Sequence, residues 1–282
     1  MTETAPEPPD SEKDEPSTET NHPAETTGRL LAVGLGPGHP EGMTLRTREA
    51  LESVDHIVGY ETYVDLLPEA LIEGAEDVYA TGMGTEVSRT ESAVDRALDG
   101  FDVALIGSGD PNVYALGGLV LEVLESRGIE PDAVGFEVVP GVPAAQSSAA
   151  RLGAPLVNDA VTISLSDHLT TIEEIESRLR AVAPEGFALA IYNPWSPSRR
   201  ENFQLACEIL LEHRPPDTPV GIVRGAGREN EQTHLTDLET LPELGGSDVL
   251  DMTSTIIVGT AETRVWGDRL LTPRGYERKY DY

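Results

Sequence analysis

The 282-residue chain carries 50 Asp plus Glu against 20 Lys plus Arg, a formal net charge of −30 at pH 7. This charge excludes nucleic acid as the expected partner, because phosphates are bound mainly through Lys and Arg, and the length suffices for two modest domains. Lysine occurs only at Lys13 and Lys279, and such an acidic, lysine-poor composition predicts a halophilic protein that stays soluble in concentrated salt.

The first segment, residues 1–27, contains five prolines among scattered acidic residues and almost no large apolar side chains. Such a stretch cannot bury enough apolar surface to offset the entropy lost on ordering. We therefore predict a disordered acidic tail.

The segment Leu30–Gly38 has four apolar residues followed by glycines at alternate positions. This pattern predicts a buried strand that ends in a loop whose backbone approaches a ligand closely, although a purely structural tight turn has the same composition. A nicotinamide-dependent oxidoreductase, with Glu61 as the acid that binds a ribose, is an alternative. In that class the helix begins directly after the glycines, whereas here the helical pattern begins near Thr44, so the spacing disfavours it.

Two later strands end in similar loops. The strand predicted at 101–106 ends in Gly107–Pro111, and the strand at 136–139 ends in Pro140–Val142 before a helix that begins at Ala144. Because the carboxyl ends of parallel strands meet at the same edge of a sheet, the loops predict one ligand crevice. Asp110 could bind polar groups of a cofactor there, or form an Asp-Pro turn.

In the second half of the chain, predicted strands again alternate with predicted helices. Strands are predicted at 161–165, 187–192, 220–223, 232–235 and 255–258, and helices at 172–182 and 203–212. We predict an α/β protein of two domains. The N-terminal domain, residues 28–148, has a mainly parallel sheet, and the C-terminal domain, residues 149–282, has a mixed sheet.

The motifs together resemble the tetrapyrrole (precorrin) methylases over about residues 29–275. The general marks are Val33–Gly38, Gly109–Pro111 and Val139–Val142. The more specific marks are Val58–Tyr63, Ser164–Thr170, Tyr192–Pro194 with Arg199-Arg200, and Gly221–Arg224 with Ala226–Glu229. These specific marks resemble the branch that methylates C17 of precorrin-3B or cobalt-factor III and contracts the ring in cobalamin biosynthesis. Another precorrin methyltransferase, or a regulator that binds the cofactor without turnover, is an alternative.

The resemblance implies a homodimer whose subunits hold S-adenosylmethionine in a cleft between two α/β domains. Carried over position by position, the cofactor contacts are Pro37, Ser108, Gly109, Asp110, Val113, Pro143, Ala144, Asn193 and Ala226. Pro143 stands where many relatives have Ser or Thr, and Ala226 where others have Gly. Neither departure removes a charged group, so we expect binding to survive.

The implied substrate is a large macrocycle with many carboxylates, which a strongly acidic protein repels. Arginine binds carboxylates bidentately, and in molar salt the Debye length falls to about 3 Å, so distant acidic residues are screened. We predict that four arginines in loops after strands bind these carboxylates rather than water alone. They are Arg199, Arg200, Arg224 and Arg228.

Ring contraction requires proton movement at an oxygenated carbon of the macrocycle. The candidate catalytic residues are Tyr60, Glu61, Asp167 and His168. His168 is attractive because imidazole titrates near neutral pH, and a polar surface histidine is its alternative role. Any cobalt would arrive inside the substrate.

Cys207 is the single cysteine and lies in an apolar helical run, which predicts a buried structural thiol and excludes a disulfide within the chain. The six histidines lack the spacing of metal ligands, so no metal site is predicted. No apolar run reaches the roughly 18 residues of a membrane span, and the acidic N-terminus is unlike a signal peptide. We expect a cytoplasmic protein with no membrane partner.

Overall fold

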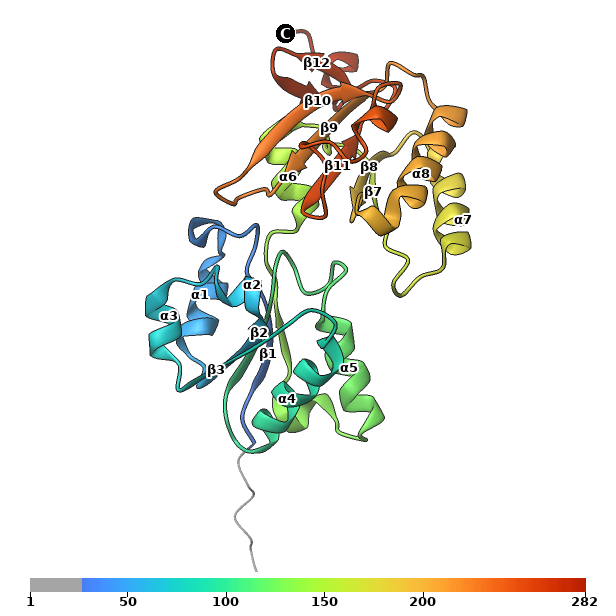
Figure 1. Cartoon of the computed structure of the whole chain (residues 1–282). Coiled ribbons are helices and arrows are strands. Elements are labelled where there is room, and N and C mark those ends of the chain that lie inside the picture. Colours follow the sequence, from blue (N-terminus) through green and yellow to red (C-terminus); the bar gives the residue numbers. More distant parts are fainter. Residues whose placement is uncertain (1–26) are drawn as a thin grey trace, which may run out of the picture.

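The computed structural model describes residues 27–282, so the predicted acidic tail lies almost wholly outside the described residues. Figure 1 shows two lobes, each with a central sheet and helices on both faces. The first lobe is drawn in blue to green, and the second in yellow to red. The C-terminus lies at the end of the second lobe that points away from the first.

The sheet of the first lobe has five parallel strands in the order β3-β2-β4-β1-β5. They are β1 (Leu30–Gly34), β2 (His56–Tyr60), β3 (Asp77–Thr81), β4 (Val103–Gly107) and β5 (Glu137–Val139). Every residue of β1 is buried, as expected for a central strand covered on both faces. The predicted parallel sheet is confirmed.

Side-chain alternation along β1 supplies two cores. Leu31 packs in the core beneath α1 and α3, whereas the adjacent Leu30 packs in the core beneath α4 and α5. The helices of this lobe are α1 (Leu45–Glu52), α2 (Glu61–Val64), α3 (Glu69–Gly74), α4 (Glu86–Leu98) and α5 (Gly117–Ser126). The two layers of helices cover both faces of the sheet, and loops lie at its carboxyl edge (Figure 1).

The sheet of the second lobe is mixed, as predicted, with the order β10-β9-β11-β8-β7. Only β7 and β8 pair in parallel. Its strands are β7 (Ala160–Ser164), β8 (Ala188–Tyr192), β9 (Pro219–Arg224), β10 (Gln232–Asp237) and β11 (Ser254–Val258). The remaining elements are α6 (Ala144–Leu152), α7 (Ile172–Val182), α8 (Arg200–His213), and a small sheet of β6 (Gly153–Ala154), β12 (Arg264–Trp266) and β13 (Arg269–Leu271).

Helix α6 packs on the second lobe. Its residues Ala145 and Leu152 share a core with Val223 of β9 and Ile257 of β11. The predicted division of the chain between residues 148 and 149 falls inside this helix and stays a prediction. Among residues 27–282, none of the helices combines the length and the apolar composition that crossing a bilayer requires.

Several short elements were not expected from the sequence. Strand β3 lies at the edge of its sheet, and none of its residues is fully buried. The hairpin of β12 and β13, in which Leu270 is buried, and the short helices α2 and α3 also lack a periodic apolar pattern. Edge strands and one-turn helices bury little surface, so they leave a weak signal in the sequence.

The thiol of Cys207 lies in α8 with 1% of the residue exposed. Burial raises its pKa to about 12. Because each pKa unit lowers the thiolate population about tenfold, a disulfide reagent at pH 8 should label the native protein at least about a hundredfold more slowly than the denatured protein. The measurement is the release of thionitrobenzoate with and without denaturant, and rapid labelling of the native protein would contradict the burial.

Candidate active site

The carboxyl edges of the two sheets face each other. Strands β8 and β9 both run antiparallel to β11, and β7 runs parallel to β8, so the carboxyl ends of these three strands lie at one edge. The hydroxyl of Tyr114, which follows β4 of the first lobe, donates a hydrogen bond to the carbonyl oxygen of Thr162 in β7 at 3.1 Å. The loops predicted to carry the chemistry therefore belong to one junction, at the waist of the molecule (Figure 1).

The three glycine loops of the first lobe come together at this junction. The N–H of Gly36 donates to the carbonyl oxygen of Gly109 at 3.1 Å, and the N–H of Gly109 donates to that of Gly36 at 2.8 Å. A Cβ atom added to Gly141 would lie 2.1 Å from the carbonyl oxygen of Gly109 and 2.7 Å from that of Gly34. Only glycine permits backbones to approach this closely, so these residues are required for the loops to meet.

Asp110 joins two of these loops. Its Oδ1 accepts the N–H of Asn112 at 2.8 Å, which makes a local turn, and its Oδ2 accepts the N–H of Gly141 at 3.2 Å. Asp110 thus holds the second and third loops in register. A direct bond from this carboxylate to a cofactor stays a prediction.

The second lobe contributes a wall of polar and aromatic groups. The N–H of Ala145 donates to the Tyr192 hydroxyl at 2.9 Å, and burial raises the pKa of that phenol. The Tyr192 ring centroid lies 5.1 Å from that of Tyr114, and the Asn193 amide donates to the Ser164 hydroxyl at 3.0 Å. Tyr114 and Tyr192 were not predicted as site residues, since a tyrosine in a loop or at a strand end gives no distinctive signal.

Backbone strain is concentrated here. In residues 27–282, the non-glycine residues with positive φ are Tyr114, at 52°, and Asn193, at 49°. Non-glycine residues in this conformation cost free energy and cluster at functional sites. Both strained residues lie at the junction of the lobes, which supports a binding role for this region.

Unoccupied backbone donors line the same junction. Within the described part of the chain, the N–H groups of Ser108, Ala144 and Ala226 donate no hydrogen bond to protein. A Cβ atom added to the neighbouring Gly107 would meet no atom within 4 Å, so there is open space beside Ser108. Free amide donors can bind acceptor atoms of a ligand, so this region is able to hold one.

The remaining predicted cofactor residues lie around these donors. A Cβ atom on Gly109 would lie 3.8 Å from Cα of Pro143, and one on Gly227 would lie 2.8 Å from Cβ of Pro37. Pro37, in the first lobe, therefore contacts the loop of Ala226 in the second. Val113 is half-buried and donates its N–H to the carbonyl oxygen of Asp110 at 3.1 Å.

The loop that contains Ala226 is held by Glu231. One carboxylate oxygen of Glu231 accepts the N–H of Gly227 at 2.6 Å, and both oxygens accept the Nε–H of Arg151 at 2.8 Å. Partial burial acts to raise the pKa of Glu231, but these bonds outweigh it and hold the pKa below the ordinary value of 4.5. The stabilisation is therefore complete above that value and is lost as the pH falls through the lowered pKa.

We expect Glu231→Gln to weaken the binding of S-adenosylmethionine severalfold at pH 7, because the anionic clamp on the loop is removed. The affinity of the unmodified protein should fall towards that of the variant as the pH drops below about 4.5. Isothermal titration at several pH values measures both effects. Glu229→Gln, at an exposed neighbouring position, is the matched control, and equal losses in the two variants would contradict the clamp.

The four predicted substrate arginines do not form one cluster. Arg228 lies between the lobes, where a Cβ atom on Gly38 would come within 3.0 Å of its Cγ. Arg224 instead donates to the carbonyl oxygen of Asp248 at 2.6 Å, and the Arg200 guanidinium lies 5.9 Å from the Trp195 ring centroid. A groove of about 350 Å³ adjoins Trp195, and Arg199 lies in the turn just before α8. Of the four, Arg228 thus has the clearest place at the junction.

The candidate catalytic residues occupy two separate loops. Tyr60 ends β2 and packs edge-on against Tyr63 with ring centroids 5.2 Å apart, while Glu61 begins α2 and is exposed. Asp167 and His168 are exposed in the loop after β7. No hydrogen bond or ion pair among the described residues links the two pairs, so their joint action stays a prediction.

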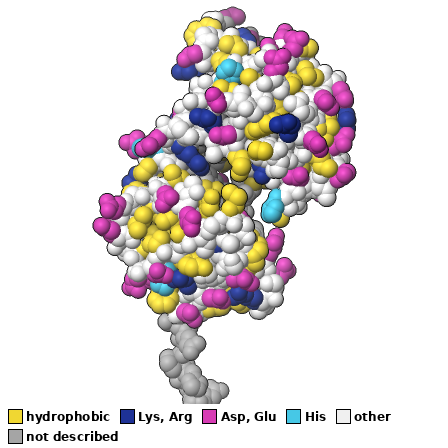
Figure 2. All heavy atoms as spheres, viewed as in Figure 1, with side chains coloured by type: hydrophobic (Ala, Val, Ile, Leu, Met, Phe, Trp, Pro, Cys, Tyr) yellow, Lys and Arg dark blue, Asp and Glu magenta, His cyan; other side chains and the backbone are white. Residues whose placement is uncertain are grey.

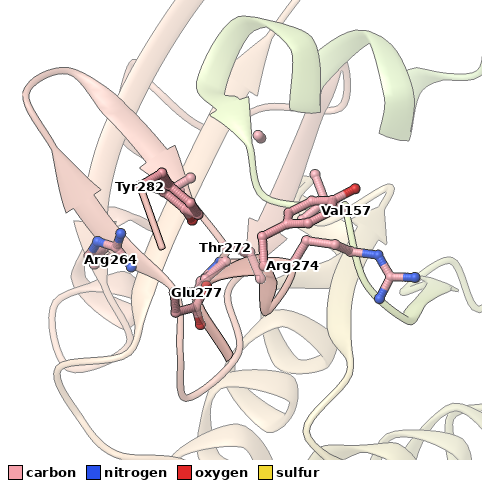
Figure 3. Close-up of a pocket in the computed structure, with 10 residues that line it drawn as sticks. Val157, Arg264, Thr272, Arg274, Glu277 and Tyr282 are labelled. Carbon is pink, nitrogen blue, oxygen red and sulfur yellow. The ribbon is translucent and has the colours of Figure 1, made fainter. Parts of the chain in front are cut away.

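A large cavity lies outside this junction. Figure 3 shows a cavity of about 810 Å³ beside the small sheet, with Arg264, Arg274 and Tyr282 among its lining residues. It contains none of the predicted site residues. In the described part of the chain, no three His, Cys, Asp or Glu side chains are grouped so as to hold a metal ion.

Basic and hydrophobic side chains are visible along the waist between the lobes in Figure 2, while acidic side chains are spread over the outer surfaces. Positive charge at the junction favours the binding of an anionic ligand there.

Comparison with known proteins identifies the class to which this fold and site belong. Residues 29–242 match the family described as Tetrapyrrole (Corrin/Porphyrin) Methylases, and the chain belongs to this family. In that family the methyl donor is S-adenosylmethionine. The helix that follows the glycines, α1, begins only at Leu45, so the geometry also disfavours a dinucleotide site.

Two individual relatives show which members of this family the chain is similar to. The chain is 46% identical over 256 residues to a cobalt-factor III methyltransferase of Priestia megaterium, covering 90% of this chain and 46% of that one. It is 38% identical over 247 residues to a probable cobalt-factor III C(17)-methyltransferase of Salmonella typhimurium, covering 88% of this chain and 99% of that one. The chain thus spans about half the length of the first relative and nearly all of the second.

The chain is also similar to solved structures of methyltransferases. The methyltransferase CobJ superposes with a TM-score of 0.78 at 35% identity, covering 88% of this chain and all of that one. A uroporphyrin-III C-methyltransferase of Thermus thermophilus, complexed with S-adenosylhomocysteine, superposes with a TM-score of 0.61 at 25% identity, covering 82% of this chain and 97% of that one.

Proposed function

We propose that this protein transfers a methyl group from S-adenosylmethionine to C17 of precorrin-3B or cobalt-factor III, with ring contraction, in cobalamin biosynthesis. The observation that carries the proposal is the similarity to the probable cobalt-factor III C(17)-methyltransferase of Salmonella typhimurium along nearly the whole length of that relative. The specific sequence marks, from Val58–Tyr63 to Ala226–Glu229, support the same branch.

The cofactor is proposed to lie between the lobes. Free N–H groups at Ser108, Ala144 and Ala226 would bind its polar edges, and the strained Asn193 would close one side. When bound, S-adenosylmethionine supplies an electrophilic methyl group on a sulfonium. Since the departing thioether is neutral, the protein needs to align the reactants and exclude water more than it needs a strong acid. The remaining predicted contact residues are proposed to shape this site. They are Pro37, Gly109, Asp110, Val113 and Pro143.

The macrocycle is proposed to enter the same junction from the side of Arg228. The guanidinium of Arg228 would bind a carboxylate bidentately, while Arg199, Arg200 and Arg224 would reach more distant carboxylates. For the ring contraction, Tyr60, Glu61, Asp167 and His168 remain the proposed proton-transfer residues.

We propose further that the protein is a cytoplasmic homodimer adapted to high salt, with domains at residues 28–148 and 149–282. The excess of acidic over basic residues supports the salt adaptation. Sedimentation equilibrium in molar potassium chloride measures the oligomeric state, and a single-chain mass would contradict the dimer.

The decisive experiment incubates the protein, purified in high salt, with methyl-labelled S-adenosylmethionine and either precorrin-3B or cobalt-factor III. We expect one labelled methyl group at C17 of a ring-contracted product, read by mass spectrometry and nuclear magnetic resonance. Label at another carbon would favour a different precorrin methyltransferase. Cofactor binding with no turnover on either substrate would favour a regulator and overturn the proposal.

A further inference from the structure

A buried arginine in the first lobe lacks an anionic partner. Arg89, in the first turns of α4, is 3% exposed, yet no carboxylate among residues 27–282 pairs with it. Its Nε–H donates to the Thr81 hydroxyl at 2.7 Å, and its Nη2 donates to the carbonyl oxygen of Gly82 at 3.0 Å and more weakly to the Thr85 hydroxyl at 3.4 Å. All these acceptors are neutral, although a buried cation is costly without a compensating anion.

One end of this guanidinium remains available. Nη1 of Arg89 makes no hydrogen bond within the described residues and is not among their enclosed unpartnered atoms, so it reaches solvent. The bonds through Nε and Nη2 fix the plane of the group. Such a pre-positioned donor loses little entropy when it binds a ligand.

The available end lies at the carboxyl edge of the first sheet. Thr81 ends β3 and Tyr60 ends the neighbouring β2, and Cζ of Arg89 lies 5.7 Å from the Tyr60 ring centroid. Arg89 therefore belongs to the edge that faces the second lobe, beside a residue already proposed to act in the reaction.

A second arginine approaches the same tyrosine pair. Burial raises the pKa of Tyr63, which packs against Tyr60, and the positive charges of Arg228 and Arg89 oppose that shift. Among residues 27–282, the carboxylate that raises the pKa of Tyr63 is that of Glu86, which accepts the N–H of Gly84 and forms no ion pair with either arginine. Two guanidinium groups, one from each lobe, thus act on Tyr63, and in the described part of the chain neither forms an ion pair with a carboxylate.

We infer that Arg89 binds a peripheral carboxylate of the macrocyclic substrate through Nη1, and so is a substrate-binding residue of the first lobe opposite Arg228. This inference rests on the proposed function. The chemistry of the guanidinium favours a planar carboxylate, and the neutral acceptors around Nε and Nη2 leave its charge for the ligand.

The test is the binding of uroporphyrin III, followed by its absorbance band, so that no turnover is required. We expect Arg89→Gln to weaken binding about tenfold or more, the loss expected for one charge-assisted hydrogen bond. Arg96→Gln, on the same helix but paired with Asp77 at 2.6 Å, is the matched control and should leave binding within about twofold.

The same porphyrin with its carboxylates converted to primary amides separates binding from structure. If Arg89 binds a carboxylate, the substitution weakens binding of the carboxylate form far more than of the amide form. An equal loss for both forms, or no loss for either, overturns the inference. If Arg89→Gln does not fold, as judged by circular dichroism, Arg89→Lys is titrated with both porphyrins and must show the same preferential loss.

Failure of the proposed function can be distinguished from failure of this inference. The unmodified protein could bind the porphyrin through Arg89 and yet transfer no methyl group to precorrin-3B or cobalt-factor III, which would overturn the function alone. Normal methyl transfer together with an unchanged porphyrin affinity of Arg89→Gln would overturn the inference alone.

Discussion

Gly141→Ala is expected to destabilise the protein by about 3 kcal/mol or more and to abolish cofactor binding. The added Cβ would meet two backbone oxygens, of Gly109 at 2.1 Å and of Gly34 at 2.7 Å, and neither can move without separating the glycine loops. Chemical denaturation measures the free energy of unfolding, and isothermal titration with S-adenosylmethionine measures the binding.

The matched control is Gly118→Ala. Gly118 lies in α5, and an added Cβ would meet no atom within 4 Å. Because alanine favours the helical conformation, this change should stabilise the protein by about 0.5 to 1 kcal/mol and leave binding unchanged. If Gly141→Ala behaved like this control, the close approach of the three loops would be wrong.

Asp110→Ala is expected to lower the affinity for S-adenosylmethionine about tenfold or more, because two backbone N–H groups lose their charged acceptor. The bonds from Asn112 and Gly141 hold two loops in register, so their loss should loosen the site on the side of the first lobe. Asp110→Asn keeps one acceptor oxygen and should lie between the two. Titration calorimetry orders the three proteins.

Asp132→Ala provides the control for this series. Asp132 is exposed in the short turn before β5, and its side chain makes no hydrogen bond within the described residues. Its removal should leave the affinity unchanged. An affinity of Asp110→Ala equal to that of the control would show that the carboxylate does not organise the site.

Much of the fold could be predicted from local patterns. Both bounds of α7 agree with the sequence-based prediction. In α7 the reason is a capping box, in which Thr171 and Glu174 bond reciprocally to each other's backbone N–H groups. The parallel and mixed sheets followed from strands that alternate with helices.

The candidate site was predictable only in part. Glycine-rich loops can be recognised from the composition of the sequence. Because the carboxyl ends of parallel strands lie at one edge of a sheet, these loops could also be predicted to lie close together. The burial of Arg89 was not foreseen, because an arginine in an amphipathic helix ordinarily faces solvent. For Arg224 the sequence predicts a bond to a substrate carboxylate but gives no sign of its bond to the carbonyl oxygen of Asp248, which lies 24 residues away in the chain.

The sequence by itself determined longer helices such as α7, the central strands and the three glycine loops, since neighbouring residues alone specify periodicity, caps and turns. Only the tertiary structure decided that Tyr114 reaches Thr162, that Pro37 contacts the loop of Ala226, and that Arg228 lies against Gly38. These contacts join segments distant in the chain, and their geometry depends on how two separately packed sheets meet, which no local pattern encodes.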